Sequence, residues 1–280
     1  MAFDDPIAEA AYAAALACRY GTANGSTSIL WNDTIARLLE HKSVRAYRSE
    51  PLPDSVVPTL VAAAQSAASS SNLQYWSVVA VTDVERRKQL AQLAGGQQHI
   101  IDAPLILLWV ADLARAHDIA SRNDAPAEGF VFLESFLVAA LDAALAAHNA
   151  VIAAESLGLG TVYIGALRNR PEEVAAIIEL PSNSAVVFGL VVGWPDAERT
   201  PGIKPRLPQS AVLHHEHYSS AVQAAAVERY DGTARVFQQS QGQPAVGWIS
   251  QVLQRGASAA ALHGRDRLAD ALKALGFGLR

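Results

Sequence analysis

The chain has 280 residues, of which 51% are hydrophobic and 18% are charged, so it can form a sizeable buried core and its composition excludes a disordered chain. The formal net charge is -5, which argues against a generally basic nucleic-acid-binding protein. Cys18 is the single cysteine, so no intrachain disulfide can form, in agreement with a reducing compartment.

The first thirty residues are predicted to form an N-terminal arm. Asp5 and Pro6 are typical of a helix cap followed by the first helical position, and the alanine-rich residues 7–20 continue that helix. The N-terminus is acidic, whereas a secretory signal peptide begins with basic residues. We therefore expect a helical arm over residues 1–30, without evident chemistry, and one domain over residues 31–280.

A basic segment follows the next predicted helix, at residues 34–40, which Asn32 or Asp33 can cap. Residues 41–48, with the sequence HKSVRAYR, place four potential cations and a hydroxyl before the Pro-Leu-Pro breaker at residues 51–53. Guanidinium and ammonium groups make charge-assisted hydrogen bonds to phosphate oxygens, so this segment could bind a phosphate group. The alternative is a solvated helix end, where cations also favour the helix dipole.

The remainder of the chain alternates predicted helices with short apolar strands. Strands are expected at residues 76–82, 105–111, 161–164 and 185–192. Helices are expected at residues 54–68, 83–94, 130–157, 171–180, 245–253 and 265–275, and a variable polar segment at 112–128. The uninterrupted apolar runs at 105–111 and 185–192 are typical of strands buried on both faces. This alternation predicts an α/β sandwich.

The helix over residues 130–157 is apolar nearly all round, which predicts a central, buried helix. Glu134, Asp142, His148 and Glu155 interrupt it, so no window of it reaches the uncharged length of a membrane span. We therefore expect a soluble cytoplasmic protein with no membrane partner. The same apolar run is a candidate core for a large interface between two copies of the chain.

Two apparent motifs are better explained without a function. The glycines of residues 158–160 follow a predicted helix and precede a strand, the reverse of a dinucleotide-binding turn, so a helix C-cap is the preferred interpretation. The histidines of residues 214–217 occupy adjacent positions that do not share a helix face, so we interpret them as a polar surface run and expect no metal site.

Three adjacent serines, Ser69, Ser70 and Ser71, end the predicted helix over residues 54–68. No nucleophile-elbow pattern surrounds them, and no partner histidine can be assigned. Their hydroxyls suit hydrogen bonding to a polyol or a phosphate, and an ordinary loop is the alternative.

A second cationic loop contains Lys204 and Arg206 on either side of Pro205. Proline restricts the backbone and lowers the entropy cost of presenting both cations. Whether this loop and residues 41–48 converge on one anion is left open by the sequence alone.

In this order and spacing, the segments resemble the flavin-dependent nitroreductase superfamily, and within it the branch of oxygen-insensitive NADPH nitroreductases and NADPH–flavin oxidoreductases. The similarity extends from about residue 33 to about residue 218. The segments that carry it are HKSVR at 41–45, SSSNLQ at 69–74, AGGQ at 94–97, AESLGLG at 154–160, VYIG at 162–165, LRN at 167–169, FGL at 188–190, GWP at 193–195 and KPRLP at 204–208.

This resemblance implies an α+β protein, a three-layer α/β/α sandwich with a mixed central sheet wrapped by helices. It also implies an intertwined homodimer with FMN bound at the subunit interface. The ribityl phosphate would then be held by His41, Lys42 and Ser43 together with Lys204 and Arg206. Arg48 would remain a surface cation.

The resemblance further assigns residues around the flavin ring. Ser69, Ser70, Ser71 and Gln74 would line the flavin from the second subunit. Arg45 and Gln97 would face the pyrimidine ring. Tyr163, Ile164 and Gly165 would supply backbone near N5 and O4, next to Ala166, where relatives often have glycine.

The implied activity is a ping-pong transfer of hydride from NADPH, through the flavin, to an acceptor such as a nitroaromatic, a quinone, an azo compound or free flavin. No protein nucleophile or base is required, because the cofactor carries the chemistry. The resemblance assigns NADPH binding to Arg265, whereas Gln241 lies in the segment where the branch has a second arginine. NADH is the alternative donor.

A different functional class remains open, a flavin store or redox sensor without efficient turnover. Gln241 and Ala166 are the residues that would indicate such a protein, because both lie in the expected nicotinamide-binding region. Dehalogenating and flavin-fragmenting branches of the superfamily need other substrate-loop motifs, which we do not find.

Overall fold

The computed structural model describes residues 6–21, 29–221 and 223–280, so the predicted cap Asp5 and most of the loop after the first helix lie outside the described residues. The chain divides into two compact units, which are described separately below. The smaller unit comprises residues 1–42 and 201–261, and the larger comprises residues 43–200 and 262–280. An arm that ends at residue 30, followed by one domain, stays a prediction.

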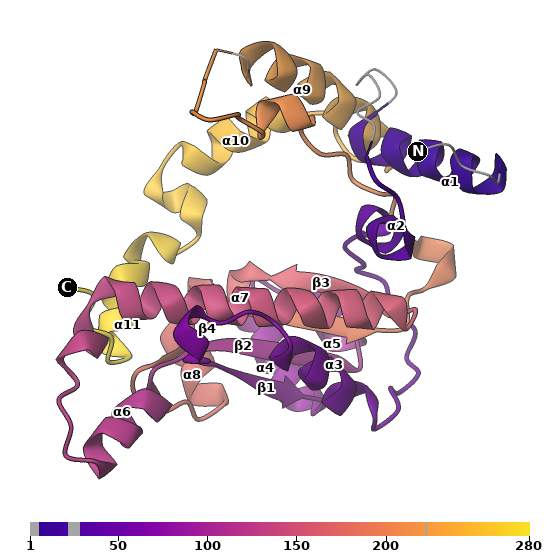
Figure 1. The fold of residues 1–280 in the computed structure, drawn as a ribbon. Coiled ribbons are helices and arrows are strands. Elements are labelled where there is room, and N and C mark those ends of the chain that lie inside the picture. Colours follow the sequence, from indigo (N-terminus) through magenta and orange to yellow (C-terminus); the bar gives the residue numbers. More distant parts are fainter. Residues whose placement is uncertain (1–5, 22–28, 222) are drawn as a thin grey trace. The chain divides into compact units, whose positions relative to one another are not determined.

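A four-stranded sheet lies at the centre of the larger unit (Figure 1). Its strands are β1 (Trp76–Val81), β2 (Leu105–Asp112), β3 (Gly160–Ile164) and β4 (Ser184–Gly193), in the spatial order β1-β2-β4-β3. These bounds confirm the four predicted strands to within two residues at each end.

All three strand pairings are antiparallel. Among the described residues, parallel pairing occurs at the isolated bridge between Ser43 and Thr161. The expected mixed sheet is therefore corrected to an antiparallel four-stranded sheet with one parallel bridge beside β3. The physical reason is that the connection after β1 contains two helices and re-enters the sheet at the end where β1 left it, so that Val81 pairs with Ile106.

The two faces of the sheet are covered by different helices. On one face, Ile106, Leu108 and Val110 of β2 join a cluster with α4 (Val84–Leu93), α5 (Gln98–Asp102) and α8 (Pro171–Ile177). The alternate residues Leu105, Leu107 and Trp109 pack with α3 (Val56–Gln65) and α7 (Leu133–Ser156). Successive side chains of a strand point to opposite faces, so a doubly covered strand is apolar at every position. The layered α+β architecture and the doubly buried β2 are confirmed.

Helix α7 crosses one face of the sheet (Figure 1). Its buried positions are mainly alanines, whose small side chains allow close packing against α3 and the sheet. Its other side carries Leu133, Leu137, Leu141 and Leu145, each about half exposed. The predicted central helix is thus confirmed, but it is buried on one side only.

By length and composition, α7 is the one described helix that could cross a membrane. The expectation that its charged residues exclude this is not met by those two criteria alone. The core helix of a soluble protein passes the same test, and α7 packs its alanine side on the sheet.

The remaining helices of the larger unit are α6 (Ala114–Arg122) and α11 (Leu268–Ala274). Helix α6 lies within residues 112–128, where the sequence indicated only a variable polar segment. Helix α11 confirms the centre of the predicted helix over residues 265–275.

The smaller unit consists of α1 (Pro6–Tyr20), α2 (Asp33–Glu40), α9 (Gln223–Ser240) and α10 (Trp248–Gly256). Asn32 caps α2, because its Oδ1 accepts a hydrogen bond of 2.9 Å from the amide of Ile35. Helices α9 and α10 are joined through Asp231, whose Oδ1 accepts from the amide of Ile249 at 2.8 Å. Helix α9 was not predicted as a separate element.

Candidate functional site

The larger unit holds residues 43–48 as an extended segment beside β3. The amide of Val44 donates to the carbonyl of Thr161 at 2.9 Å, and the Tyr47 hydroxyl donates to the carbonyl of Val44 at 2.7 Å. Val44 and Tyr47 are buried, whereas Arg45 is exposed. A Cβ at Gly160 would lie 2.8 Å from the Val44 Cβ, so glycine permits this close approach. The segment therefore presents Arg45 outward from an anchored backbone.

In the smaller unit, one buried side chain joins the two predicted cationic loops. Arg19 of α1 is 5% exposed. Its Nη1 donates to the carbonyl of Lys204 at 2.8 Å, and its Nη2 donates to the carbonyls of Leu39 at 2.6 Å and His41 at 2.8 Å. The amide of Arg206 donates to the carbonyl of Arg19 at 2.8 Å. The structure thus connects the backbone at His41 with the backbone at Lys204 and Arg206.

The second cationic loop is also held from α9. The hydroxyl of Tyr230 donates to the carbonyl of Pro205 at 2.9 Å, and burial raises the pKa of Tyr230. Pro205 itself is buried, while Lys204 and Arg206 on either side of it are exposed. The backbone between the two cations is therefore held in place, and the Arg206 guanidinium itself donates to the carbonyl of Lys204 at 3.0 Å.

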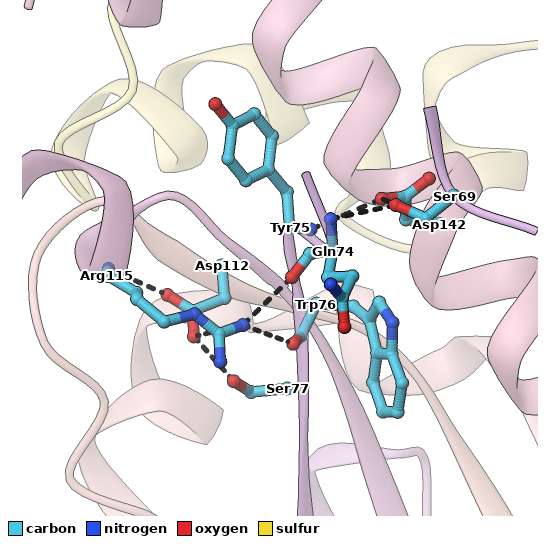
Figure 2. A network of polar contacts seen from close by, with 8 residues as sticks. All are labelled: Ser69, Gln74, Tyr75, Trp76, Ser77, Asp112, Arg115 and Asp142. Atoms are coloured by element: carbon cyan, nitrogen blue, oxygen red, sulfur yellow. Dashed lines mark hydrogen bonds and ion pairs between the residues drawn. The ribbon is translucent and has the colours of Figure 1, made fainter. Parts of the chain in front are cut away.

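The serine loop of the larger unit is organised around a carboxylate that the sequence did not single out (Figure 2). Asp142 of α7 is 2% exposed. Its Oδ2 accepts from the Ser69 hydroxyl at 2.7 Å and from the amide of Tyr75 at 3.2 Å, while its Oδ1 accepts from the amide of Ser70 at 3.2 Å. The Ser69 Oγ in turn accepts from the amide of Gln74 at 2.8 Å. One carboxylate thus holds both ends of the loop.

The conformation of this loop is unusual. Ser71, Asn72 and Gln74 have φ angles of 49°, 57° and 53°, in a region that side-chain-bearing residues adopt infrequently. Such conformations persist where the surroundings determine them, and they concentrate at ligand sites. Ser70, Ser71 and Gln74 are exposed, so the loop presents polar groups outward.

Arg115 of α6 holds the far side of the same loop (Figure 2). Its Nη2 donates to the carbonyls of Gln74 at 2.9 Å and Trp76 at 2.8 Å. Asp112 lies 4.0 Å from that nitrogen and accepts from the Ser77 hydroxyl. Sequence reasoning missed Arg115 because its segment carries no local pattern and its partners are backbone carbonyls.

The turn after β3 contains the predicted ring-edge residues. Ile164 is buried, whereas Tyr163 is exposed and packs edge-on against Phe188 at 5.0 Å between ring centroids. A Cβ at Gly165 would lie 3.2 Å from Nη2 of Arg168, so glycine leaves room for that guanidinium under the turn. Ala166 is half-buried in the same turn.

Arg168 and Arg265 bring two guanidinium groups near this turn. Burial is the main cause that lowers the pKa of Arg168, and the charge of Arg265 lowers it further. Arg168 donates to the carbonyl of Val187, and the Nε of Arg265 donates to the carbonyl of Leu262 at 2.9 Å. Arg265, the residue expected to bind NADPH, therefore interacts with an arginine that lies under the turn of Gly165.

A cavity of about 630 Å³ lies in the same unit. Its lining includes Gly95, Asn169, Arg170, Gly264 and Arg267. The Oδ1 of Asn169 is buried without a hydrogen-bond partner in the structure. The cavity is large enough for part of a dinucleotide.

Two other predicted positions have local roles in the structure. Gln97 is half-buried and its Nε2 donates to the carbonyl of Ala94 at 2.8 Å. Gln241 accepts from the amide of Gly202 at 2.8 Å through its Oε1, so it supports the backbone that leads into the second cationic loop.

The predicted polar histidine run is engaged locally. His214 stacks on Tyr218 with 4.4 Å between ring centroids, and its Nδ1 accepts from the amide of Ser219 at 3.3 Å. In the part of the chain that the structure describes, no group of three or more His, Cys, Asp or Glu side chains is arranged to hold a metal ion.

Comparison with known proteins identifies the family of this arrangement. The family model described as "Nitroreductase family" matches residues 38–194, and the model of its C-terminal domain matches residues 204–280. The chain belongs to the nitroreductase family. It is an NAD(P)H oxidoreductase of the FMN reductase and nitroreductase type, as the resemblance implied.

Individual relatives agree with this assignment. The chain is 44% identical over 202 residues to an FMN reductase [NAD(P)H] of Bacillus subtilis, covering 71% of this chain and 80% of that protein. It is 40% identical over 206 residues to an NADPH-flavin oxidoreductase of Vibrio harveyi, covering 74% and 82%. The solved structure of the NADPH:FMN oxidoreductase from Vibrio harveyi complexed with NAD+ superposes with a TM-score of 0.79 at 35% identity, covering 89% of this chain and 100% of that chain.

Proposed function

We propose that this nitroreductase-family enzyme binds FMN and uses NADPH, or NADH, to reduce nitroaromatics, quinones, azo compounds or free flavin in a ping-pong cycle. The observation that carries the proposal is the joining of two cationic loops through Arg19. Cationic side chains at two separate sequence positions are thereby held on one connected backbone, as binding of a phosphate group requires.

The residues of the smaller unit fit the phosphate end of FMN. His41, Lys42, Lys204 and Arg206 supply cationic or hydrogen-bond-donating groups, and the phosphate of FMN is close to a dianion. In the larger unit, Ser43 is held in register beside β3 by its bridge to Thr161. We propose that these five residues bind the ribityl phosphate.

Residues of the larger unit fit the ring end. Exposed Arg45 and half-buried Gln97 suit the pyrimidine edge, where a positive charge favours the reduced, anionic flavin. Tyr163, Ile164, Gly165 and Ala166 form the turn that would approach N5 and O4. The loop of Ser69, Ser70, Ser71 and Gln74 would line the flavin of the partner subunit. When bound, FMN supplies the hydride-accepting atom, and these residues bind and orient it.

The donor site is proposed at Arg265 and the neighbouring cavity. Arg265, Gly264 and Arg267 belong to one turn, and Gly264 and Arg267 line the cavity. A guanidinium there suits the additional phosphate of NADPH. Gln241 holds the amide of Gly202 instead of offering a second cation, which supports the use of NADH as well.

The function is tested by anaerobic mixing of the purified protein with NADPH and, separately, with NADH. We expect a yellow protein whose visible flavin absorbance is bleached rapidly by NADPH and restored by a quinone or a nitroaromatic. The physical reason is that both substrates exchange a hydride with one bound flavin. Bound flavin that neither donor bleaches would contradict turnover and support a flavin store or sensor. A protein without flavin affinity would contradict both.

The homodimer is proposed from the exposed side of α7. Leu133, Leu137, Leu141 and Leu145 recur every fourth residue and are 49–54% exposed, so they form one apolar stripe along the helix. Contiguous exposed apolar surface of this kind marks an interaction site. Because the flavin site is proposed to be shared, this stripe would belong to a large obligate interface.

Replacing Leu141 with Asp should therefore convert a dimer into a monomer and release FMN. The cause is that an unpaired carboxylate would be buried at the centre of an apolar interface. Light scattering at several concentrations measures the outcome. Ile119→Asp is the matched control, because Ile119 is 56% exposed but belongs to α6 and not to the leucine stripe of α7. A wild-type monomer that retains FMN would contradict the shared site.

A further inference from the structure

Helix α1 lies outside both segments that the family models match, which are residues 38–194 and 204–280. The helix nevertheless contributes a buried arginine to the unit that contains both cationic loops. A buried guanidinium is costly unless its donors are satisfied, so the contacts that satisfy it hold their partners firmly. Arg19 therefore restrains the backbone of both cationic loops.

The contacts of Arg19 divide between the two loops. One terminal nitrogen serves the carbonyl of Lys204, and the other serves the carbonyls of Leu39 and His41. Because the guanidinium is planar, the spacing of its two terminal nitrogens is fixed, and it sets the separation of the carbonyls that it joins. The carbonyl of Arg19 adds a fourth link, to the amide of Arg206.

These contacts also orient the loop backbones. The carbonyl oxygens of His41 and Lys204 carry partial negative charge, and both are engaged by Arg19. Oxygens held in this way are not directed at an anion that the neighbouring side chains bind. The arginine thus engages two carbonyls that would otherwise repel an anion, and it links the backbones of the two loops that carry the cationic side chains.

We infer that Arg19 is a positioning residue of the flavin phosphate site, and that the N-terminal helix α1 is a working part of that site. This inference rests on the proposed function, because it needs FMN as the ligand. Arg19 acts through the loops and does not touch the cofactor. This role would replace the expectation that residues 1–30 carry no evident chemistry, which stays a prediction until the test below is made.

The test compares FMN with riboflavin, which has the same ring and lacks the phosphate. Dissociation constants for both are measured by flavin fluorescence on wild type, Arg19→Gln and Arg19→Lys. We expect the constant for FMN to rise by about tenfold to a hundredfold in both variants, since charge-assisted hydrogen bonds that order the loops are lost. The constant for riboflavin should be unchanged. Lysine keeps the positive charge but lacks the two terminal guanidinium nitrogens that join the loops, so it should not rescue FMN binding.

Arg37→Gln is the matched control, because Arg37 is an exposed arginine of the neighbouring helix α2 that pairs with Glu40 at 3.3 Å. It should leave both constants unchanged. The FMN-to-riboflavin affinity ratio does not depend on the fraction of folded protein, so a destabilised variant remains informative. An unchanged ratio in Arg19→Gln, equal weakening of both flavins, or full rescue by lysine would overturn the inference. A wild type with equal affinity for the two flavins would instead contradict the phosphate site of the proposed function.

Discussion

Replacing Lys204 and Arg206 together by alanine is expected to raise the dissociation constant for FMN by about 10² to 10⁴-fold. A hydrogen bond to a charged group contributes about 1.5–3 kcal/mol, and two such groups would be lost from the phosphate. Both side chains are exposed, so their removal should leave the free energy of unfolding nearly unchanged. Equilibrium titration with FMN and chemical unfolding of the apoprotein measure the two quantities.

The single variants and a nearby control make this experiment specific. Lys204→Ala and Arg206→Ala should each cause part of the loss, and the shortfall from additivity reports how far the two cations share one anion. Arg199→Ala, which removes an exposed arginine paired with Asp196 at 2.7 Å, should have no effect. Wild-type affinity should also fall as ionic strength rises. An unchanged constant in the double variant would show that the phosphate lies elsewhere.

The parts of the fold that could be predicted are those with a strong local pattern. The apolar runs that became β2 and β4 read as doubly buried strands because both of their faces are covered by helices. Helix α2 was predicted from its cap and its spacing, and Asn32 makes the expected hydrogen bond. In contrast, the antiparallel direction of every strand pair depends on the path of the connections, which periodicity does not report.

The candidate site was predictable only where its chemistry is local. The two cationic loops stand out because charges are clustered beside proline. Arg19, Asp142 and Arg115 do not, because their partners are groups far away in the sequence. The hydrogen bond from Arg19 to Lys204 spans 185 positions, and that from Ser69 to Asp142 spans 73. Asp142 was visible in the sequence as an acidic residue in an alanine-rich helix, but it was interpreted only as an interruption of an apolar run.

Asp142 gives the second large effect. Asp142→Asn should lower the free energy of unfolding by about 1–3 kcal/mol, because an amide has one acceptor oxygen where the carboxylate has two. Three donors converge on the carboxylate, from Ser69, Ser70 and Tyr75, so the amide nitrogen must face at least one of them. The substitution keeps the side-chain volume, so no cavity contributes to the loss. Urea unfolding measures it, with Glu134→Gln, at an exposed position of the same helix, as the control.

A double-mutant cycle with Ser69→Ala separates loop positioning from general stability. Ser69 both donates to Asp142 and accepts from the amide of Gln74. It therefore links the Asp142 carboxylate to the far end of the loop. We expect a coupling free energy of about 1 kcal/mol between the two substitutions. Both single variants should also weaken FMN and riboflavin equally, because this loop is proposed to line the ring rather than the phosphate. That equal loss is opposite to the FMN-selective loss expected for Lys204, Arg206 and Arg19. A loss confined to FMN in Asp142→Asn would therefore contradict the separate roles of the two units.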